Sequence, residues 1–226
     1  MLISPSRPLA HPAPKSGVLR LASLVSAVVF AYLALVIIRG GRLSWDISIL
    51  EYWHRHATPS LDKVAVFLTI AGNTGPMVGL GLLVFLGLLA RRQGRAAWVF
   101  FAAVGGSMLL TQLIKPLVAR PRPVLWASIR PEHTFSFPSG HAMDTAAIAA
   151  ALVLLVWGRR GRGWVWATMP LFSLAVGGAR MYLGVHNPSD VLAGWAAAVA
   201  WVVLVHLIAR RPEPAPVLTT ALPTAA

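Results

Sequence analysis

The chain has 226 residues, of which 57% are hydrophobic and only 12% are charged, and its formal net charge is +13. A mean hydropathy of +0.68 excludes an ordinary soluble domain and indicates an integral membrane protein. The absence of cysteine excludes a disulfide framework and a thiolate metal site. The sequence has no basic run and no interleaving of basic and aromatic residues, so its positive charge does not indicate a nucleic-acid partner.

Uncharged stretches predict the membrane spans. Residues 21–38 form an 18-residue run, enough to cross a hydrocarbon core of about 30 Å at about 1.5 Å per residue. No signal-cleavage pattern follows it, which favours a retained span. Residues 64–90 are too long for one span and are interrupted at 72–76 by glycine and proline, so an interfacial helix is expected to precede or kink into the second span. Four further runs bring the total to about six helices: 96–114, 145–158 (with a helix start expected near His141), 163–179 and 191–209.

The short basic loops around residues 91–95 and 159–162 predict the topology. Such loops stay in the cytoplasm under the positive-inside rule, which also places both termini there. Much of the net charge is therefore a consequence of topology. Six of the seven acids fall on or near the opposite, outer side: Asp46, Glu51, Asp62, Glu132, Asp144 and Asp190.

The two ends differ in composition from the region between them. Residues 1–16 and 211–226 each contain four prolines and are predicted to be disordered tails. A single six-helix transmembrane domain is expected over residues 17–210. An outer segment with Trp45, Tyr52, Trp53, His54 and His56 is expected to lie at the membrane interface.

Three polar motifs, each beside a long apolar run, occur within residues 115–190. They are Lys115-x6-Arg122-Pro123, Pro138-Ser139-Gly140-His141 and Arg180-x5-His186-x3-Asp190. Transfer of a phosphoryl group needs fixed cations around its oxygens, an in-line nucleophile and an acid for the leaving group. The motifs supply a candidate for each of these roles.

The first motif is expected where the third span ends. Pro116 should end or kink the helix at Lys115, and Pro121 and Pro123 should keep the following loop extended. A snorkelling lysine beside an ordinary basic loop is the alternative reading. Arg120 and Pro121 form a second Arg-Pro pair, and only the spacing favours Arg122.

The second motif is expected to open the fourth span. Ser139 or Gly140 can cap the helix, whose first-turn N–H groups would point at an oxyanion, with His141 at the pocket rim. Plain turn and cap chemistry explains the same Pro-Ser-Gly sequence without a site.

The third motif combines a histidine with a carboxylate. His186 and Asp190 are four residues apart and would share one face of a helix, so that the carboxylate binds one ring nitrogen and leaves the other free to attack. Asp190 also suits a capping role, with Asn187 as N-cap and Pro188 as the first helical residue. Arg180, at the end of the preceding span, could meet the same phosphate.

Together, in this order, the motifs resemble the type 2 phosphatidic acid phosphatase family, the membrane relatives of vanadium haloperoxidases and bacterial acid phosphatases. The resemblance covers roughly residues 60–210. Ala179 is a departure, because the family usually has serine before the arginine of the third motif; a hydrogen bond that supports the site would be lost there.

The resemblance implies an all-α, six-transmembrane helix bundle with an extracytoplasmic active site at the membrane rim, in a bacterial-type inner or plasma membrane. His186 would attack phosphorus, Asp190 would orient it and His141 would protonate the leaving group. The phosphoryl oxygens would be held by Lys115, Arg122, Ser139, Gly140 and Arg180.

The family resemblance implies no metal or other cofactor. The substrate would be a lipid phosphate such as phosphatidic acid, phosphatidylglycerol phosphate or undecaprenyl diphosphate. A phosphotransferase, an anionic-lipid transporter and a non-catalytic scaffold are the alternatives. The role of His133 and the oligomeric state stay open at this point.

Overall fold

The computed structural model describes residues 14–41, 43–159 and 161–210, and within these ranges every regular element is a helix. The eight helices are α1 (Ser16–Ile38), α2 (Ser44–Arg55), α3 (Pro59–Ala71), α4 (Thr74–Ala90), α5 (Gly94–Val118), α6 (Gly140–Leu155), α7 (Gly163–Tyr182) and α8 (Pro188–Ala209). The predicted all-α class is confirmed for the described part of the chain. The predicted tails lie outside the described residues up to residue 13 and from residue 211, and α1 begins at Ser16.

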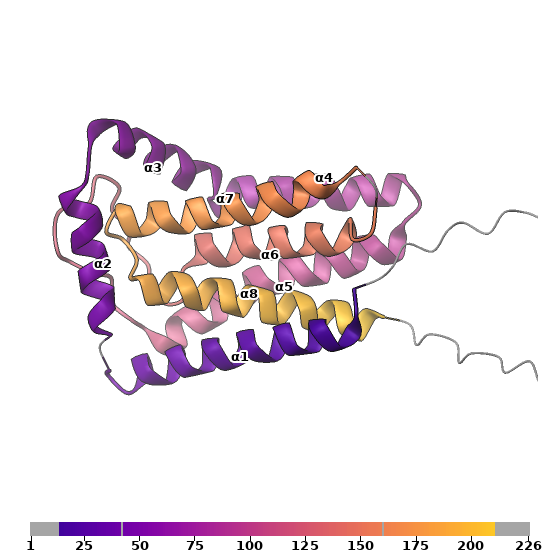
Figure 1. The fold of residues 1–226 in the computed structure, drawn as a ribbon, viewed down its shortest axis with the longest axis horizontal. Helices are drawn as coiled ribbons and strands as arrows, with labels where there is room; N and C mark the ends of the chain where they lie inside the picture. Colours follow the sequence, from indigo (N-terminus) through magenta and orange to yellow (C-terminus); the bar gives the residue numbers. More distant parts are fainter. Residues whose placement is uncertain (1–13, 42, 160, 211–226) are drawn as a thin grey trace, which may run out of the picture.

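Helices α1, α4, α5, α6, α7 and α8 lie side by side along the longest axis of the molecule, and α2 and α3 lie at one end (Figure 1). Helix α8 packs against α1, α5 and α6, while α6 also packs against α7. The long loop of residues 119–139 closes the same end as α2. The basic turns between α4 and α5 and between α6 and α7 lie at the opposite end.

The helix boundaries test the expected breaks. The run 64–90 is divided into α3 and α4, which meet at an angle of 48°. Helix α6 begins at Gly140, next to the residue where its start was expected. Pro116 was expected to end or kink the helix at Lys115; the helix does not end there, because α5 continues to Val118 with Pro116 inside it. Pro116 has no N–H to donate to the Gln112 carbonyl, but the helix continues for two more residues, and the Ala119 N–H donates to the Lys115 carbonyl at 2.9 Å.

Length and apolar character identify several membrane-spanning helices. Among the described residues α1, α5 and α8 are each long and apolar enough to cross a bilayer, and the bent pair α3 and α4 gives a fourth candidate. Helix α6 is apolar but shorter. The protein is therefore an integral membrane protein.

A close approach of α6 and α8 fixes the geometry at the start of both helices. A Cβ on Gly194 would lie only 2.8 Å from the Ser139 carbonyl oxygen. The Ser139 N–H donates to the Asp190 carbonyl at 3.0 Å. Further along, α6 and α8 contribute small buried side chains to one apolar cluster: Ala146, Ala147, Ala151, Ala197 and Ala198. The N-terminus of α6 is thus tied directly to the first turn of α8.

Candidate active site

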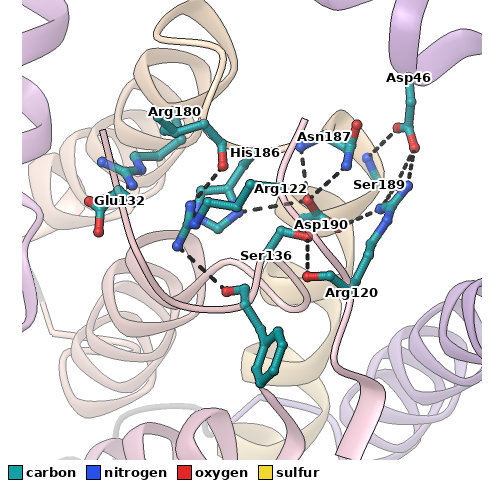
Figure 2. A network of polar contacts seen from close by, with 12 residues as sticks. Asp46, Arg120, Arg122, Glu132, Ser136, Arg180, His186, Asn187, Ser189 and Asp190 are labelled. Atoms are coloured by element: carbon teal, nitrogen blue, oxygen red, sulfur yellow. Dashed lines mark hydrogen bonds and ion pairs between the residues drawn. The ribbon is translucent and has the colours of Figure 1, made fainter. Parts of the chain in front are cut away.

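The three motifs converge at the end of the bundle that carries α2. The 119–139 loop and the short connection 183–187 bring Arg122 of the first motif beside the third motif (Figure 2). The second motif joins them through the Ser139 N–H, which donates to the Asp190 carbonyl at 3.0 Å. Gly184 allows the turn after α7, since its φ of +68° is in the left-handed region and a Cβ there would lie 2.7 Å from the Trp126 ring. The expected grouping of the motifs is therefore present in space.

His186 is 1% exposed and lies between a carboxylate and a guanidinium. Its Nδ1 is 3.7 Å from Asp190 Oδ2, longer than a hydrogen bond, and its Nε2 is 3.0 Å from Arg122 Nη1. A guanidinium can only donate, so Nε2 carries the lone pair and the ring proton is assigned to Nδ1, on the Asp190 side.

Burial and the positive charges of Arg180 and Arg122 lower the pKa of His186 well below its ordinary value. His186 is thus a neutral imidazole whose Nε2 lone pair faces Arg122. That is the state a nitrogen nucleophile requires.

The expected helical pairing of His186 with Asp190 is wrong in its geometry. Helix α8 begins at Pro188, so His186 lies in the loop that precedes the N-cap Asn187. Asp190 is the third helical residue, and its Oδ2 accepts the Asn187 backbone N–H at 2.8 Å in a capping box. One carboxylate therefore caps α8 and faces the imidazole, since the tight turn brings residue 186 back over the helix start.

Asp190 has a cationic partner, Arg120, that the sequence did not assign. Arg120 donates to Asp190 Oδ1, to Ser189 Oγ at 2.7 Å and to Asp46 Oδ2 at 2.9 Å. Asp46, 2% exposed on α2, also accepts the backbone N–H of Ser189 at 2.8 Å and its hydroxyl at 2.6 Å. This Asp46–Arg120–Ser189–Asp190 network connects α2 to Asp190, the carboxylate that faces the His186 ring (Figure 2).

The two Arg-Pro pairs thus have different partners. Arg120 faces the carboxylate, and Arg122 faces the imidazole. Arg122 is held by carbonyls, donating to Thr134 O at 2.6 Å and to Val185 O at 2.7 Å. The repeated Arg-Pro sequence was the one signal for Arg120, and its partner Asp46, 74 residues away, has no signal in the sequence.

Arg180 is fully buried near the end of α7, and Glu132 of the 119–139 loop is its acidic partner. Its Nη2 donates to Glu132 Oε1 at 2.7 Å. Burial alone would raise the pKa of the Glu132 carboxyl, but the Arg180 charge and hydrogen bond outweigh it and hold that pKa below the ordinary value. The other donor atoms of Arg180, Nε and Nη1, are buried and have no partner among the described residues.

Ser139 and His141 also carry buried polar atoms that have no partner in the described part of the chain. These are Ser139 Oγ and His141 Nε2. Ser139 is the N-cap of α6, and its side chain makes no capping bond. Buried polar atoms in folded proteins are nearly always hydrogen-bonded, so these atoms indicate a site for a polar ligand.

Lys115 links the first motif to the second. Its Nζ donates to Thr134 Oγ1 at 3.1 Å, and a Cβ on Gly140 would lie 3.9 Å from the same Nζ. A cavity of about 470 Å³ adjoins Lys115 and Arg122. His133 also lines this cavity, together with Gln112, Pro116, Pro121, Glu132, Thr134 and Phe135.

Ala179, the departure from the family pattern, lies in an apolar environment. It is 5% exposed and belongs to a buried cluster with Ala65, Tyr182, Leu183 and Val185. In residues 14–41, 43–159 and 161–210 no group of three or more His, Asp or Glu side chains is arranged to hold a metal ion. The cationic side chains are the groups available to balance a phosphate charge.

Comparison with known proteins identifies the family. The family model of the PAP2 superfamily matches residues 96–213. Phosphatidylglycerophosphatase B of Bacillus subtilis is 28% identical over 152 residues, covering 65% of this chain and 74% of that protein. An undecaprenyl-diphosphatase of Sulfolobus acidocaldarius is 25% identical over 158 residues, covering 68% of this chain and 73% of that protein.

Among solved structures, a transmembrane PAP2 type phosphatidylglycerolphosphate phosphatase from Bacillus subtilis superimposes with a TM-score of 0.72 at 25% identity, covering 82% of this chain and 94% of that one. The fold and the basic, histidine-containing site define a helical membrane phosphatase. Because the family match covers more than half of its residues, the chain belongs to the PAP2 superfamily.

Proposed function

We propose that this protein removes phosphate from a phosphomonoester or diphosphate of a lipid through a phosphohistidine intermediate. The observation that carries the proposal is the set of buried donors with no partner in the described chain, Ser139 Oγ, His141 Nε2 and Arg180 Nε and Nη1, beside the neutral His186. A phosphoryl group offers acceptor oxygens to all of them. Lys115, Arg122 and the backbone N–H of Gly140 complete the proposed phosphate site.

In the first step, His186 Nε2 attacks phosphorus and the bond between phosphorus and the leaving oxygen breaks. Arg122 Nη1 lies 3.0 Å from Nε2 of His186. For the attack to occur, this donor must leave Nε2 and bind a phosphoryl oxygen instead. Asp190 stabilises the positive charge that develops on the ring at Nδ1. The bound phosphate anion beside His141 favours the protonated imidazole, which gives its proton to the leaving oxygen.

In the second step, water attacks phosphorus and the P–N bond breaks, which restores His186. Neutral His141 takes the proton from that water and returns to its starting state. Inorganic phosphate is the product. If a lipid hydroxyl replaces water, the same site acts as a phosphotransferase, which is the second candidate function because the chemistry of the site is identical.

The proposed substrate is a lipid phosphate of the phosphatidic acid, phosphatidylglycerol phosphate or undecaprenyl diphosphate class. The relatives named above act on such lipids, and the cavity beside Lys115 and Arg122 adjoins the end of the candidate span α5. A headgroup can bind there while its hydrocarbon chain stays in the bilayer.

The proposed topology has six spans, with both termini in the cytoplasm and the site on the extracytoplasmic side of an inner or plasma membrane. The distribution of charge supports it. The basic turns at 91–95 and 159–162 lie at the end of the bundle opposite the candidate site, as the positive-inside rule requires.

The chemical proposal is tested with purified protein in detergent and a panel of lipid phosphates, with release of inorganic phosphate as the measurement. Because cations of the chain balance the phosphate charge, we expect hydrolysis to persist in excess EDTA. Orthovanadate should inhibit by adopting the geometry of the transition state. Loss of activity in EDTA with recovery in magnesium would refute the mechanism. Transfer to an added lipid hydroxyl without phosphate release would favour the phosphotransferase.

The topology is tested with single introduced cysteines. The chain has no cysteine of its own, so all thiol labelling of the protein comes from the introduced residue. Val124→Cys, at a loop position that is 90% exposed, should react with an impermeant maleimide in intact cells. Gly163→Cys, at an exposed position at the start of α7, should react only after permeabilisation. The reverse pattern would place the candidate site in the cytoplasm.

A further inference from the structure

A second cavity lies at the opposite end of the bundle from the candidate active site. It measures about 500 Å³ and is enclosed by α5, α6 and α8. Along α8 the first residue that lines this cavity, Val202, is 12 residues after Asp190, about 18 Å at about 1.5 Å per residue. It is therefore a separate feature of the fold that the phosphatase chemistry does not use.

The interior of this cavity is apolar. Small residues on two facing helices, Ala103 and Ala151, leave the space open, and larger apolar side chains surround it: Val99, Phe100, Leu154, Leu155 and Val202. Two of the enclosing helices, α5 and α8, are candidate membrane spans. The apolar interior thus lies where the bundle meets hydrocarbon, and the charged rim lies where the span ends.

The rim of the cavity is strongly basic. It carries Arg92, Arg95, Arg159 and Arg210, with His206 on α8. Arg95 donates to the Ala209 carbonyl and Arg210 donates to the Pro14 carbonyl at 2.7 Å, so these two arginines connect helix ends. Arg92 and Arg159 make no side-chain hydrogen bond and no ion pair with any other described residue, since the ion pairs in residues 14–41, 43–159 and 161–210 are all at the active-site end.

An apolar interior with a basic rim favours one class of ligand. A soluble anion would gain nothing from the apolar interior, and a neutral lipid would leave the two arginines without partners. We propose that the cavity binds an anionic phospholipid of the leaflet opposite the active site. Its phosphate would contact Arg92 and Arg159, and part of an acyl chain would lie between α5, α6 and α8. Basic pockets between membrane helices bind anionic headgroups by this charge complementarity.

The test compares charge-matched double variants that share the same two turns. Arg92→Gln with Arg159→Gln removes the two rim charges without removing a structural hydrogen bond of the described chain. Arg91→Gln with Arg162→Gln removes the same charge from neighbouring positions that do not line the cavity. Both pairs leave the active-site residues unchanged, so a lipid that also enters the active site affects both equally.

The measurement is native mass spectrometry of the protein in detergent during titration with phosphatidylglycerol, and with phosphatidylcholine of the same acyl chains. We expect the wild type and the control pair to retain phosphatidylglycerol in preference to phosphatidylcholine. The rim pair should bind phosphatidylglycerol about 10- to 30-fold more weakly. Equal affinity of the wild type for the two lipids, or equal losses in both pairs, would overturn the proposal.

A second variant tests the apolar part without a change in charge. Ala151→Leu places a larger side chain in the space between α6 and α8 and should displace the acyl chain, again weakening phosphatidylglycerol binding. Undiminished binding to Ala151→Leu, with its thermal midpoint in lipid-free detergent unchanged, would show that no acyl chain enters the cavity and would refute that part of the assignment.

Discussion

Replacement of Arg120 by alanine tests whether the network behind Asp190 serves catalysis. Arg120 bridges two carboxylates from distant parts of the chain, Asp46 at 2.9 Å and Asp190, and both are almost completely buried. In the proposed mechanism it contacts no phosphoryl oxygen. Its contribution is to hold the carboxylate that faces the His186 ring, which makes it a positioning residue.

The size of the effect follows from what the substitution leaves behind. Two buried carboxylates would lose their shared cation, and breaking a buried ion pair costs about 3–5 kcal/mol. For a chain of this length that corresponds to a fall in Tm of roughly 6–20 °C. A shift of about 1 Å in a catalytic group lowers rate by about 10²-fold. We therefore expect kcat to fall by about that factor while KM changes little, because the phosphate-binding donors stay in place.

The assay is steady-state phosphate release by Arg120→Ala in detergent, at a temperature below the lowered Tm. Arg39→Ala removes one exposed arginine at the C-terminal end of α1 and should leave both kcat and Tm unchanged. Arg120→Lys should recover part of the stability and little of the rate, since one ammonium cannot bridge both carboxylates. A normal kcat in a destabilised Arg120→Ala protein would show that the network is structural only.

Two further predictions concern the histidines. His186→Ala should abolish turnover of alkyl and aryl phosphates alike. His141→Ala should largely spare an aryl phosphate, because its leaving group needs little protonation. Equal losses in the two variants on both substrates, with no acid-labile phosphoenzyme in the wild type, would show that the roles are misassigned. The lowered pKa of His186 keeps the nucleophile neutral as the pH falls. We therefore expect kcat/KM for the aryl phosphate to stay constant through about pH 6.5, once it is corrected for ionisation of the substrate near about pH 6. A fall in kcat/KM centred near about pH 6.5 would contradict the neutral nucleophile.

The helices were largely predictable because apolar runs and breaking residues act locally. Gly72 and Asn73 separate α3 from α4, with Pro76 in the first turn of α4, and Gly140 begins α6 as the cap chemistry suggests. The prediction failed at Pro116, because a proline ends a helix only when the lost bond and the steric clash cannot be accommodated. Only Leu117 and Val118 follow Pro116 within α5, so a bend at the proline displaces little of the helix, and Lys115 lies within α5.

The residues of the candidate site were predictable from the sequence, but the hydrogen bonds and ion pairs between them were not. The motifs identified the groups that meet, but spacing alone suggested that His186 and Asp190 share a helix face, and they do not. The bonds that order the site join residues far apart in sequence, such as Asp46 with Ser189 and Glu132 with Arg180. Such pairs depend on how α2 and the 119–139 loop fold over the bundle, which no local pattern encodes.

Gly194 shows how a residue outside all three motifs can control the site. A Cβ at this position would lie 2.8 Å from the Ser139 carbonyl oxygen and 3.3 Å from the Met143 backbone nitrogen. Neither is the flexible end of a side chain, so Gly194→Ala must push α6 away from α8. The shift would carry Ser139 and His141 away from His186, which is held on the α8 side.

We expect Gly194→Ala to lower kcat by up to about 10²-fold and to destabilise the protein by about 1–3 kcal/mol through overpacking. Alanine is the better helix former by about 1 kcal/mol, so helix propensity alone predicts the opposite change in stability. Gly178→Ala on α7 is the matched control, because nothing lies within 4 Å of its Cβ. If phosphate release and Tm respond alike in the two variants, the contact between α6 and α8 does not set the geometry of the site, and its alignment must then come from the 119–139 loop.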